Sequence, residues 1–177
     1  ALLNLEAFSS DAVRREARNT LDYISWCYAL GSYRLKHYPP MRRRYDKEGI
    51  RALTTDYQSI YMKAWLGFLP ASDYDRDIHN GEVHFLTGSY MPYRPADEVV
   101  KMLFDKGEGY FVEIGHGPGV CSEIYSVGKH FLLSAGGAGR GKRSFIIARP
   151  IALFLDDTAV QLEDVIHLAG PGKDLMK

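Results

Sequence analysis

The segment from Tyr33 to Tyr45 concentrates side chains that could transfer protons or hold an anion. It contains Tyr33, His37, Tyr38, Arg42, Arg43, Arg44 and Tyr45. In β-elimination from an acidic sugar, a base removes the proton beside the carboxylate, cationic groups stabilise the developing charge, and an acid protonates the leaving oxygen. Adjacent arginines would lower the pKa of a tyrosine that acts as the base. The alternative is a surface loop whose aromatic rings pack on helices and whose arginines are solvated.

A glycine-rich stretch at residues 112–119 is a second candidate. It resembles the first motif of S-adenosylmethionine-dependent methyltransferases, where a strand ends in glycines that let the backbone approach the cofactor. That fold needs a helix after the glycines and then a strand that ends in an acid. Here residues 122–126 have a strand pattern, and Phe131–Ser134 leads into glycines with no acid. A hairpin loop is therefore favoured, and its glycines would leave the ring of His116 accessible.

The segment Tyr93-Arg94, between Pro92 and Pro95, is an aromatic and basic linker. It would either stack on a sugar ring or hold two parts of the chain together. The other histidines lack the spacing of metal ligands, and two cysteines are too few for a thiolate site. The sequence therefore predicts neither a metal nor another cofactor.

The composition restricts the class of partner. The chain has 177 residues, of which 46% are apolar, and its 22 basic residues equal its 22 acidic ones. A balanced charge gives no bulk attraction to nucleic acid or to an acidic membrane. No segment has the roughly 18–20 consecutive apolar residues of a membrane helix. We therefore expect no nucleic-acid partner and no membrane partner.

Helical patterns dominate the first half of the chain. Apolar residues recur every three or four positions after Ser10, which predicts a helix over Asp11–Leu30. A second helix is expected to begin at Thr55, with Gln58 completing a capping box, and to end at Phe68. The stretch Ala71–Asn80 is polar, and Asn80-Gly81 indicates a turn. A short helix is expected over Asp97–Lys106.

Strand patterns dominate after Gly107, separated by glycine clusters and other turn residues. The expected strands are Tyr110–Ile114, Ser122–Ser126, His130–Ser134, Ser144–Ala148, Ile151–Leu155, Val160–Leu162 and Val165–Leu168. Short strands with no helices between them favour an antiparallel sheet or sandwich. The predicted fold class is α+β, with a helical part at residues 1–78 and a linker helix and sheet at residues 79–177.

The order of these features resembles the heparinase II/III-like and alginate-lyase-like polysaccharide lyases, which have an α/α toroid followed by an antiparallel β-sandwich. The stretches that carry the resemblance are Leu21-Asp22-Tyr23, Tyr28–Ser32, Arg44-Tyr45, Tyr93-Arg94-Pro95, Val99-Val100, Ser122–Ser126, Phe131–Gly137 and Ala148-Arg149-Pro150. Residues 1–78 would be the last toroid helices and residues 79–177 the first sandwich strands, so the resemblance implies that the chain is part of a longer one.

The resemblance also implies an activity and a set of site residues. The substrate would be an acidic polysaccharide cleaved by β-elimination in a secreted or periplasmic setting. His37, with Tyr38 or Tyr45, would act from the toroid and His116 from the sandwich. Binding residues would be Tyr33, Arg42, Arg43, Tyr93 and Arg94. The Asn-His pair of many members is absent from the helical half, so either it lies upstream of this chain or this member has lost or changed its chemistry.

Three alternatives remain open at the level of sequence. The same aromatic and basic residues would serve a carbohydrate-binding or scaffold module that performs no reaction. A methyltransferase would need a parallel sheet and a cofactor pocket at Gly115–Gly119. A glycoside hydrolase would need two facing carboxylates, for which Glu113 and Glu123 are the nearest candidates.

Overall fold

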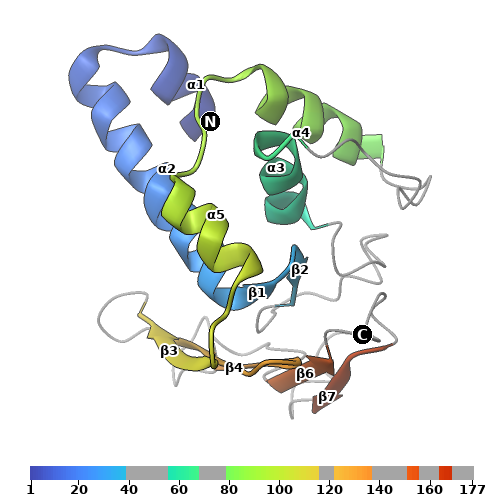
Figure 1. The fold of residues 1–177 in the computed structure, drawn as a ribbon. Helices are drawn as coiled ribbons and strands as arrows, with labels where there is room; N and C mark the ends of the chain where they lie inside the picture. The colour runs from blue at the N-terminus through green and yellow to red at the C-terminus, as the bar shows by residue number, and fades with distance from the viewer. Residues whose placement is uncertain (39–55, 68–78, 116–121, 137–150, 156–163, 169–177) are drawn as a thin grey trace, which may run out of the picture.

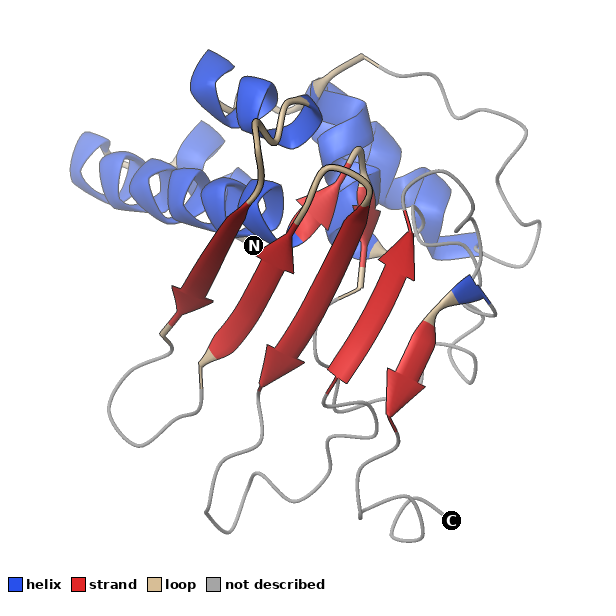
Figure 2. Cartoon of the chain, turned by 60° about the horizontal axis from the view of Figure 1, so that its bottom comes forward, coloured by secondary structure: helices blue, strands red, loops and turns tan. Residues whose placement is uncertain are grey.

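Helices lie on one side of an antiparallel sheet in this protein (Figures 1 and 2). The computed structural model describes residues 1–38, 56–67, 79–115, 122–136, 151–155 and 164–168. Helices occupy mainly the first part of the sequence and strands the second. This confirms the predicted α+β class. The toroid and the sandwich stay predictions.

The helical part is built on α2 (Asp11–Gly31), preceded by α1 (Leu2–Phe8). Ala17, Leu21 and Tyr28 repeat at helical spacing and are buried, which explains why this sequence forms a long amphipathic helix. The predicted helix Asp11–Leu30 is thus confirmed. The helix α1 was not predicted from the sequence, although its leucines have a helical repeat and Leu3 is buried.

Two shorter helices correct the sequence predictions. The helix α3 (Tyr57–Trp65) begins after Asp56, whose carboxylate accepts the N–H groups of Gln58 and Ser59, so the cap is not Thr55. The helix α4 (His79–Tyr90) occupies the stretch where Asn80-Gly81 indicated a turn, and that prediction is wrong. Turn-forming residues are tolerated there because the first turn of a helix has N–H groups without intrahelical partners.

The remaining helix, α5 (Asp97–Phe104), ends two residues before the predicted Lys106. It packs against α2, while α4 packs against α3. Gly88 permits the second contact, because a Cβ atom there would lie only 2.9 Å from Cβ of Ala64. Helices α4 and α5 therefore pack with the helical part, although they follow residue 78 in the sequence.

Five strands form an antiparallel meander in the order β3-β4-β5-β6-β7. They are β3 (Tyr110–Ile114), β4 (Glu123–Val127), β5 (Phe131–Gly136), β6 (Ile151–Leu155) and β7 (Ile166–Leu168). The predicted strands are confirmed to within two residues at each end, and the predictions for 144–148 and 160–162 lie outside the described residues. A separate hairpin, β1 (Ser32–Tyr33) and β2 (Lys36–His37), follows α2 directly.

The hairpin and the inner face of the sheet share one core. Tyr125, Leu132 and Phe154 of the sheet are 0–1% exposed, and they cluster with Tyr33 and Tyr38. Alternation along each strand places these residues on the face toward the helices. The hairpin thus lies between the two parts of the molecule.

Two side chains from beyond α5 complete the end of α2. The ammonium group of Lys106 donates to the carbonyl of Ala29 at 2.5 Å, and the hydroxyl of Tyr110 donates to that of Leu30 at 2.7 Å. The last carbonyls of a helix have no intrahelical partner, so these bonds satisfy groups that burial would otherwise leave unpaired. They also fix the start of the sheet against α2.

The contact between Gly31 and Tyr125 gives a test of how the helices meet the sheet. A Cβ atom at Gly31 would lie 2.7 Å from Cζ of Tyr125. We expect Gly31→Ala to lower the free energy of unfolding by about 1–3 kcal/mol through overpacking. Gly115→Ala is the control, since nothing lies within 4 Å of a Cβ atom there. Urea unfolding measures both, and an equal effect of the two substitutions would contradict this packing.

Candidate functional site

The β1–β2 hairpin carries the candidate residues Tyr33, His37 and Tyr38 into the region between helices and sheet. Its turn residues Arg34 and Leu35 have φ angles of +47° and +69°. Few residues other than glycine adopt this conformation, so the turn is strained. Burial of Leu35 among the helices helps to hold it, because Leu35 is 7% exposed and packs with Tyr28 and Met62.

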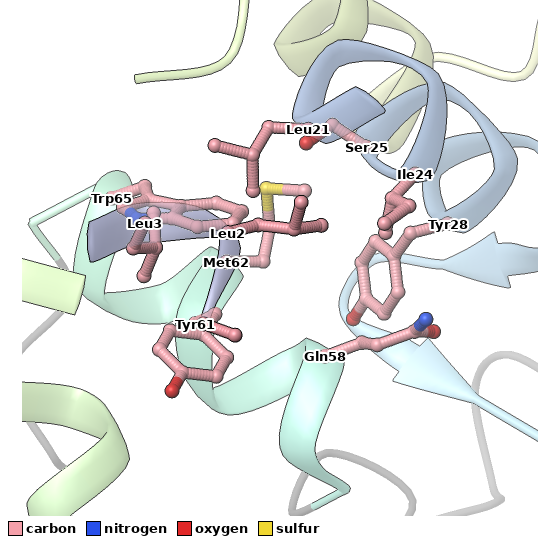
Figure 3. A pocket seen from close by; sticks show the side chains of 11 residues that line it. Leu2, Leu3, Leu21, Ile24, Ser25, Tyr28, Gln58, Tyr61, Met62 and Trp65 are labelled. Atoms are coloured by element: carbon pink, nitrogen blue, oxygen red, sulfur yellow. The ribbon is translucent and has the colours of Figure 1, made fainter. Parts of the chain in front are cut away.

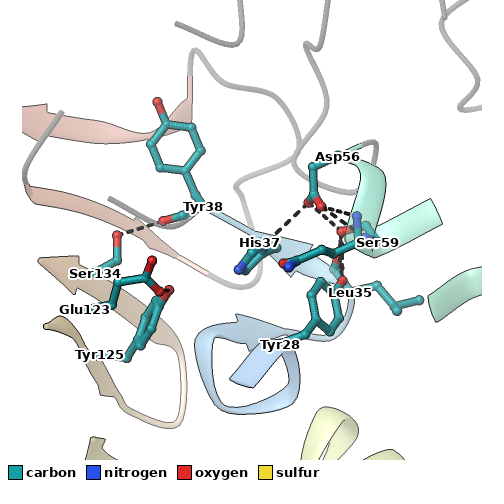
Figure 4. Close-up of polar contacts among 10 residues, drawn as sticks. Tyr28, Leu35, His37, Tyr38, Asp56, Ser59, Glu123, Tyr125 and Ser134 are labelled. Atoms are coloured by element: carbon teal, nitrogen blue, oxygen red, sulfur yellow. Dashed lines mark hydrogen bonds and ion pairs between the residues drawn. The ribbon is translucent and has the colours of Figure 1, made fainter. Parts of the chain in front are cut away.

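His37 lies opposite a buried carboxylate. Its Nδ1 atom is 3.5 Å from Oδ2 of Asp56, and both side chains are 6% exposed. The atoms are within ion-pair distance but lack the alignment of a hydrogen bond. The ring of Tyr28 lies beside the imidazole, with centroids 4.9 Å apart. The pair is drawn in Figure 4.

Hydrogen bonds fix Asp56 rigidly. Its carboxylate accepts the N–H groups of Gln58 at 2.8 Å and Ser59 at 3.1 Å, and the Ser59 hydroxyl at 2.7 Å. The hydroxyl of Tyr28 lies 2.8 Å from that of Ser59 and donates to the carbonyl of Leu35 at 3.2 Å. The network joins α2, the hairpin and the start of α3, and it orients the carboxylate toward His37.

Charge determines the protonation of this network. Burial acts to raise the pKa of Asp56, but the electrostatic attraction of the His37 imidazole and the hydrogen bonds from Ser59 outweigh it, so the pKa lies below its usual value. Burial raises the pKa of Tyr28 well above its usual value, and the negative charge of Asp56 adds to this. Asp56 is therefore ionised and Tyr28 neutral at neutral pH.

The region between the helices and the sheet, where the hairpin lies, is called the junction below. On its sheet side are Ser134 and the pair of Tyr125 and Glu123. The hydroxyl of Ser134 donates to the carbonyl of Tyr38 at 2.7 Å, and that of Tyr125 donates to Oε2 of Glu123 at 2.8 Å. The side chain of Tyr38 is fully buried, and its hydroxyl points away from His37 and Asp56 (Figure 4). His37 and Tyr38 thus lie next to the sheet, but their side chains diverge.

Two buried polar atoms at the junction have no hydrogen-bond partner within the described part of the chain. They are Nδ1 of His37 and Oγ of Ser32, and their residues face each other in the hairpin register. Buried polar groups are paired in the great majority of cases, so such a pair of exceptions is unusual. Oε2 of Glu6 and Nε1 of Trp65 are also unpaired, so it is the coincidence with the His37–Asp56 ion pair that makes this region the candidate site.

The other site residues proposed from the sequence do not lie beside His37 and Asp56 in the described structure. Tyr93 is fully buried, and its hydroxyl donates to Asp22 at 2.9 Å and lies 3.0 Å from that of Ser25, which ties the linker to α2. Arg94 donates to the carbonyls of Met91 at 2.6 Å and Ser89 at 3.0 Å, at the end of α4. Neither reaches His37. Arg42, Arg43, Tyr45 and His116 lie outside the described residues.

Asp56 is the residue that sequence reasoning missed. It stands between Thr55 and the helix, where its carboxylate serves as the cap and also meets His37. An acid at a helix start is a known capping signal. Its pairing with a histidine 19 positions earlier depends on the hairpin and follows from no local pattern.

The strand pairing in the sheet can be compared with what two of the alternative functions, a methyltransferase and a glycoside hydrolase, would require. All pairings among the described strands are antiparallel, whereas the methyltransferase alternative required a parallel sheet. Glu123 pairs with Ile114, and Glu113 with Ile124, which places the two carboxylates on opposite faces. They do not face each other as the acids of a glycoside hydrolase would.

A separate apolar pocket of about 340 Å³ lies between α1, α2 and α3 (Figure 3). Leucine side chains of α1 and α2 line it together with Tyr61, Met62 and Trp65. None of the residues proposed from the sequence as site residues borders it. Its lining suits apolar contacts, and it shares Tyr28 with the His37–Asp56 network.

Neither a membrane-spanning helix nor a metal-binding cluster is found among the described residues. No helix there is long and apolar enough to cross a membrane. No group of three His, Cys, Asp or Glu side chains there is arranged to hold a metal ion. Comparisons with protein-family models, curated proteins and solved structures found no match to this chain.

Proposed function

We propose that this chain acts by β-elimination on an acidic, uronate-containing polysaccharide, as a polysaccharide lyase-like protein. The observation that supports this most is the buried pair of His37 and Asp56 at the junction of helices and sheet. A histidine held by a carboxylate is a common arrangement for proton transfer. His37 would act on the substrate, and Asp56 would position its ring.

The proposed reaction needs few groups. A base takes the proton on the carbon beside the uronate carboxylate, that electron pair forms a carbon-carbon double bond, and the glycosidic bond to the leaving oxygen breaks as that oxygen is protonated. His37 is the proposed base, and Tyr38 or Tyr45 the proposed acid. Arg42 and Arg43 would neutralise the carboxylate, where negative charge develops.

The outer face of the sheet supports the sandwich that such a protein would contain. Several residues that alternate with the core positions are apolar and exposed, among them Phe111 at 68%, Ile166 at 67% and Leu155 at 48%, although Glu113 on the same face is charged. An antiparallel sheet with one solvated face normally carries polar residues there. We propose that a second sheet covers this face.

Carbohydrate binding without a reaction is the second candidate function. The exposed fractions of His37, Tyr38, Tyr33 and Tyr93 are between 0% and 6%, which suits structural side chains better than groups that contact substrate. In that case the basic residues alone would hold the glycan, and His37 would only stabilise the junction.

The ultraviolet absorbance of unsaturated uronate products distinguishes these functions. With alginates, pectins and heparan-type glycans as substrates, we expect the wild-type rate to fall about 10²–10⁴-fold in His37→Gln. The control is His84→Gln, since His84 lies on α4 and bonds to Tyr61 instead. Tyr38→Phe and Tyr45→Phe then identify the acid, and circular dichroism verifies folding. Glycan binding with no absorbance change would support the second candidate and contradict elimination.

A further inference from the structure

A second pocket, of about 260 Å³, lies beside the turn of the β1–β2 hairpin. Three connections form it: the hairpin turn, the segment between α5 and β3, and the turn between β4 and β5. Its basic residues are Arg34, Lys106, Lys129 and His130, and Asp105 is the acid among its lining residues. Three separate segments thus bring cationic side chains to one concave site.

Tyr33 holds two of these segments together. Its hydroxyl donates to the carbonyl of Lys129, and its ring lies under the guanidinium group of Arg34, 5.9 Å from Cζ to the ring centroid. The ring is 5% exposed, so it forms a fixed wall. The positions of Arg34 and Lys129 are therefore coupled through one buried side chain, as expected of a preorganised binding site.

The hairpin turn fixes the backbone of Arg34. A two-residue hairpin turn of this kind has positive φ angles at both central residues, which are +47° at Arg34 and +69° at Leu35. The N–H of Arg34 donates to the carbonyl of Leu103 at 3.4 Å, which ties the turn to α5. The turn places the guanidinium group of Arg34 beside the pocket.

Basic side chains outnumber the one acid of the pocket. The carboxylate of Asp105 accepts the N–H of Gly107 at 2.9 Å, which holds it in the turn that leads to β3, and its charge offsets one of the cations. The ammonium group of Lys106 is directed to the carbonyl of Ala29, and its side chain forms part of the wall. Arg34, Lys129, His130 and Asp105 are the exposed charged or titratable residues of the lining, whereas Lys106 is buried.

We propose that this pocket is a subsite for a carboxylate group of the acidic glycan, distinct from the His37–Asp56 pair. Arginine binds a carboxylate through two parallel hydrogen bonds, and the lysine adds a point charge. That the ligand is a glycan rests on the function proposed above. That this pocket binds a carboxylate rests only on its own residues, and so does not depend on that function.

The test titrates the full chain with sodium glucuronate at low salt and follows backbone amide resonances. We expect saturable shifts at Arg34, Gly107 and Lys129. Arg34→Gln and Lys129→Gln should each weaken binding about tenfold, because each removes a charge-assisted contact. Arg34→Lys should retain more affinity than Arg34→Gln. Thermal unfolding shows that the variants are folded.

Arg15→Gln is the matched control, since Arg15 is exposed on α2 away from the pocket. If Arg15→Gln weakened glucuronate binding as much as the pocket substitutions do, the proposal would be overturned, because the binding would then reflect only non-specific attraction to positive charge. Absence of saturable shifts, or binding of inorganic sulfate but not of glucuronate, would overturn it too. The elimination assay with His37→Gln tests the proposed reaction independently of glucuronate binding. Failure of one proposal therefore does not refute the other.

Discussion

Replacement of Asp56 by alanine is expected to lower the free energy of unfolding by about 3–5 kcal/mol, because it removes the buried partner of His37 and leaves the N–H groups at the start of α3 without an acceptor. Asp56 is 4% exposed and accepts the N–H groups of Gln58 and Ser59, as well as the Ser59 hydroxyl. It also lies 3.5 Å from His37. No other carboxylate in the described structure combines a helix cap with a buried ion pair.

Urea unfolding monitored by circular dichroism measures this effect. Asp56→Asn should cost less than Asp56→Ala, since the amide oxygen still caps α3 while the charge is lost. Asp11→Ala is the matched control, because Asp11 opens α2 but its side chain is 96% exposed and pairs only at the surface with Arg14. We expect a change within about 0.5 kcal/mol there. Similar costs at positions 11 and 56 would contradict the buried network.

The pH dependence of the Asp56 contribution follows from the direction of its pKa. The folded-state pKa lies below the unfolded value, so the folded protein releases this proton more readily. The stabilisation is fully present above the unfolded value of about 4 and is lost as the pH falls through the lower folded-state pKa. Wild type and Asp56→Asn should therefore converge in stability on acidification.

Local patterns were sufficient to predict most of the secondary structure. The strands Tyr110–Ile114 and Ile151–Leu155 agree with the prediction at both ends, because turn residues bound each apolar run. The helix Asp11–Gly31 is predicted to within one residue, since its apolar repeat and its acidic start agree. Pattern and packing favour the same structure at these positions.

Contacts between distant segments could not be predicted in this way. Ser134 bonds to the backbone of Tyr38 across 96 positions, and Lys106 to that of Ala29 across 77. These bonds determine that the hairpin lies between helices and sheet, and hence that His37 is buried. The helix α4 was missed for a related reason. Its packing on α3 outweighs the turn preference of Asn80-Gly81.

The second large predicted effect is a pH-dependent change in the free energy of unfolding that comes from Lys106. The ammonium group of this residue is buried against a backbone carbonyl. The side chain is 7% exposed, and its hydrogen bond is to Ala29, which carries no full charge. Burial lowers the pKa of Lys106 to about 7. The pocket groups around it include Asp105, Arg34, Lys129 and His130, and the ring of Tyr110 lies 5.8 Å away.

The sign of the pH effect follows from this depressed value. An unfolded lysine titrates near 10.4, so between about pH 7 and pH 10 the unfolded chain binds more protons than the folded one. The free energy of unfolding should therefore rise with pH in this window, by on the order of 1 kcal/mol per pH unit from this residue. Below pH 7 the folded protein bears the cost of a buried charge.

Lys106→Met isolates this contribution, because methionine fills a similar volume without an ionisable group. Relative to wild type, the variant should gain stability below pH 7 and lose that advantage progressively toward pH 10, where the lost bond to Ala29 dominates. Lys101→Met is the control, since Lys101 is exposed on α5, and its difference from wild type should not vary with pH. If the free energy of unfolding varied with pH in the same way for wild type and Lys106→Met, Lys106 would have an ordinary pKa and solvent would reach the end of α2.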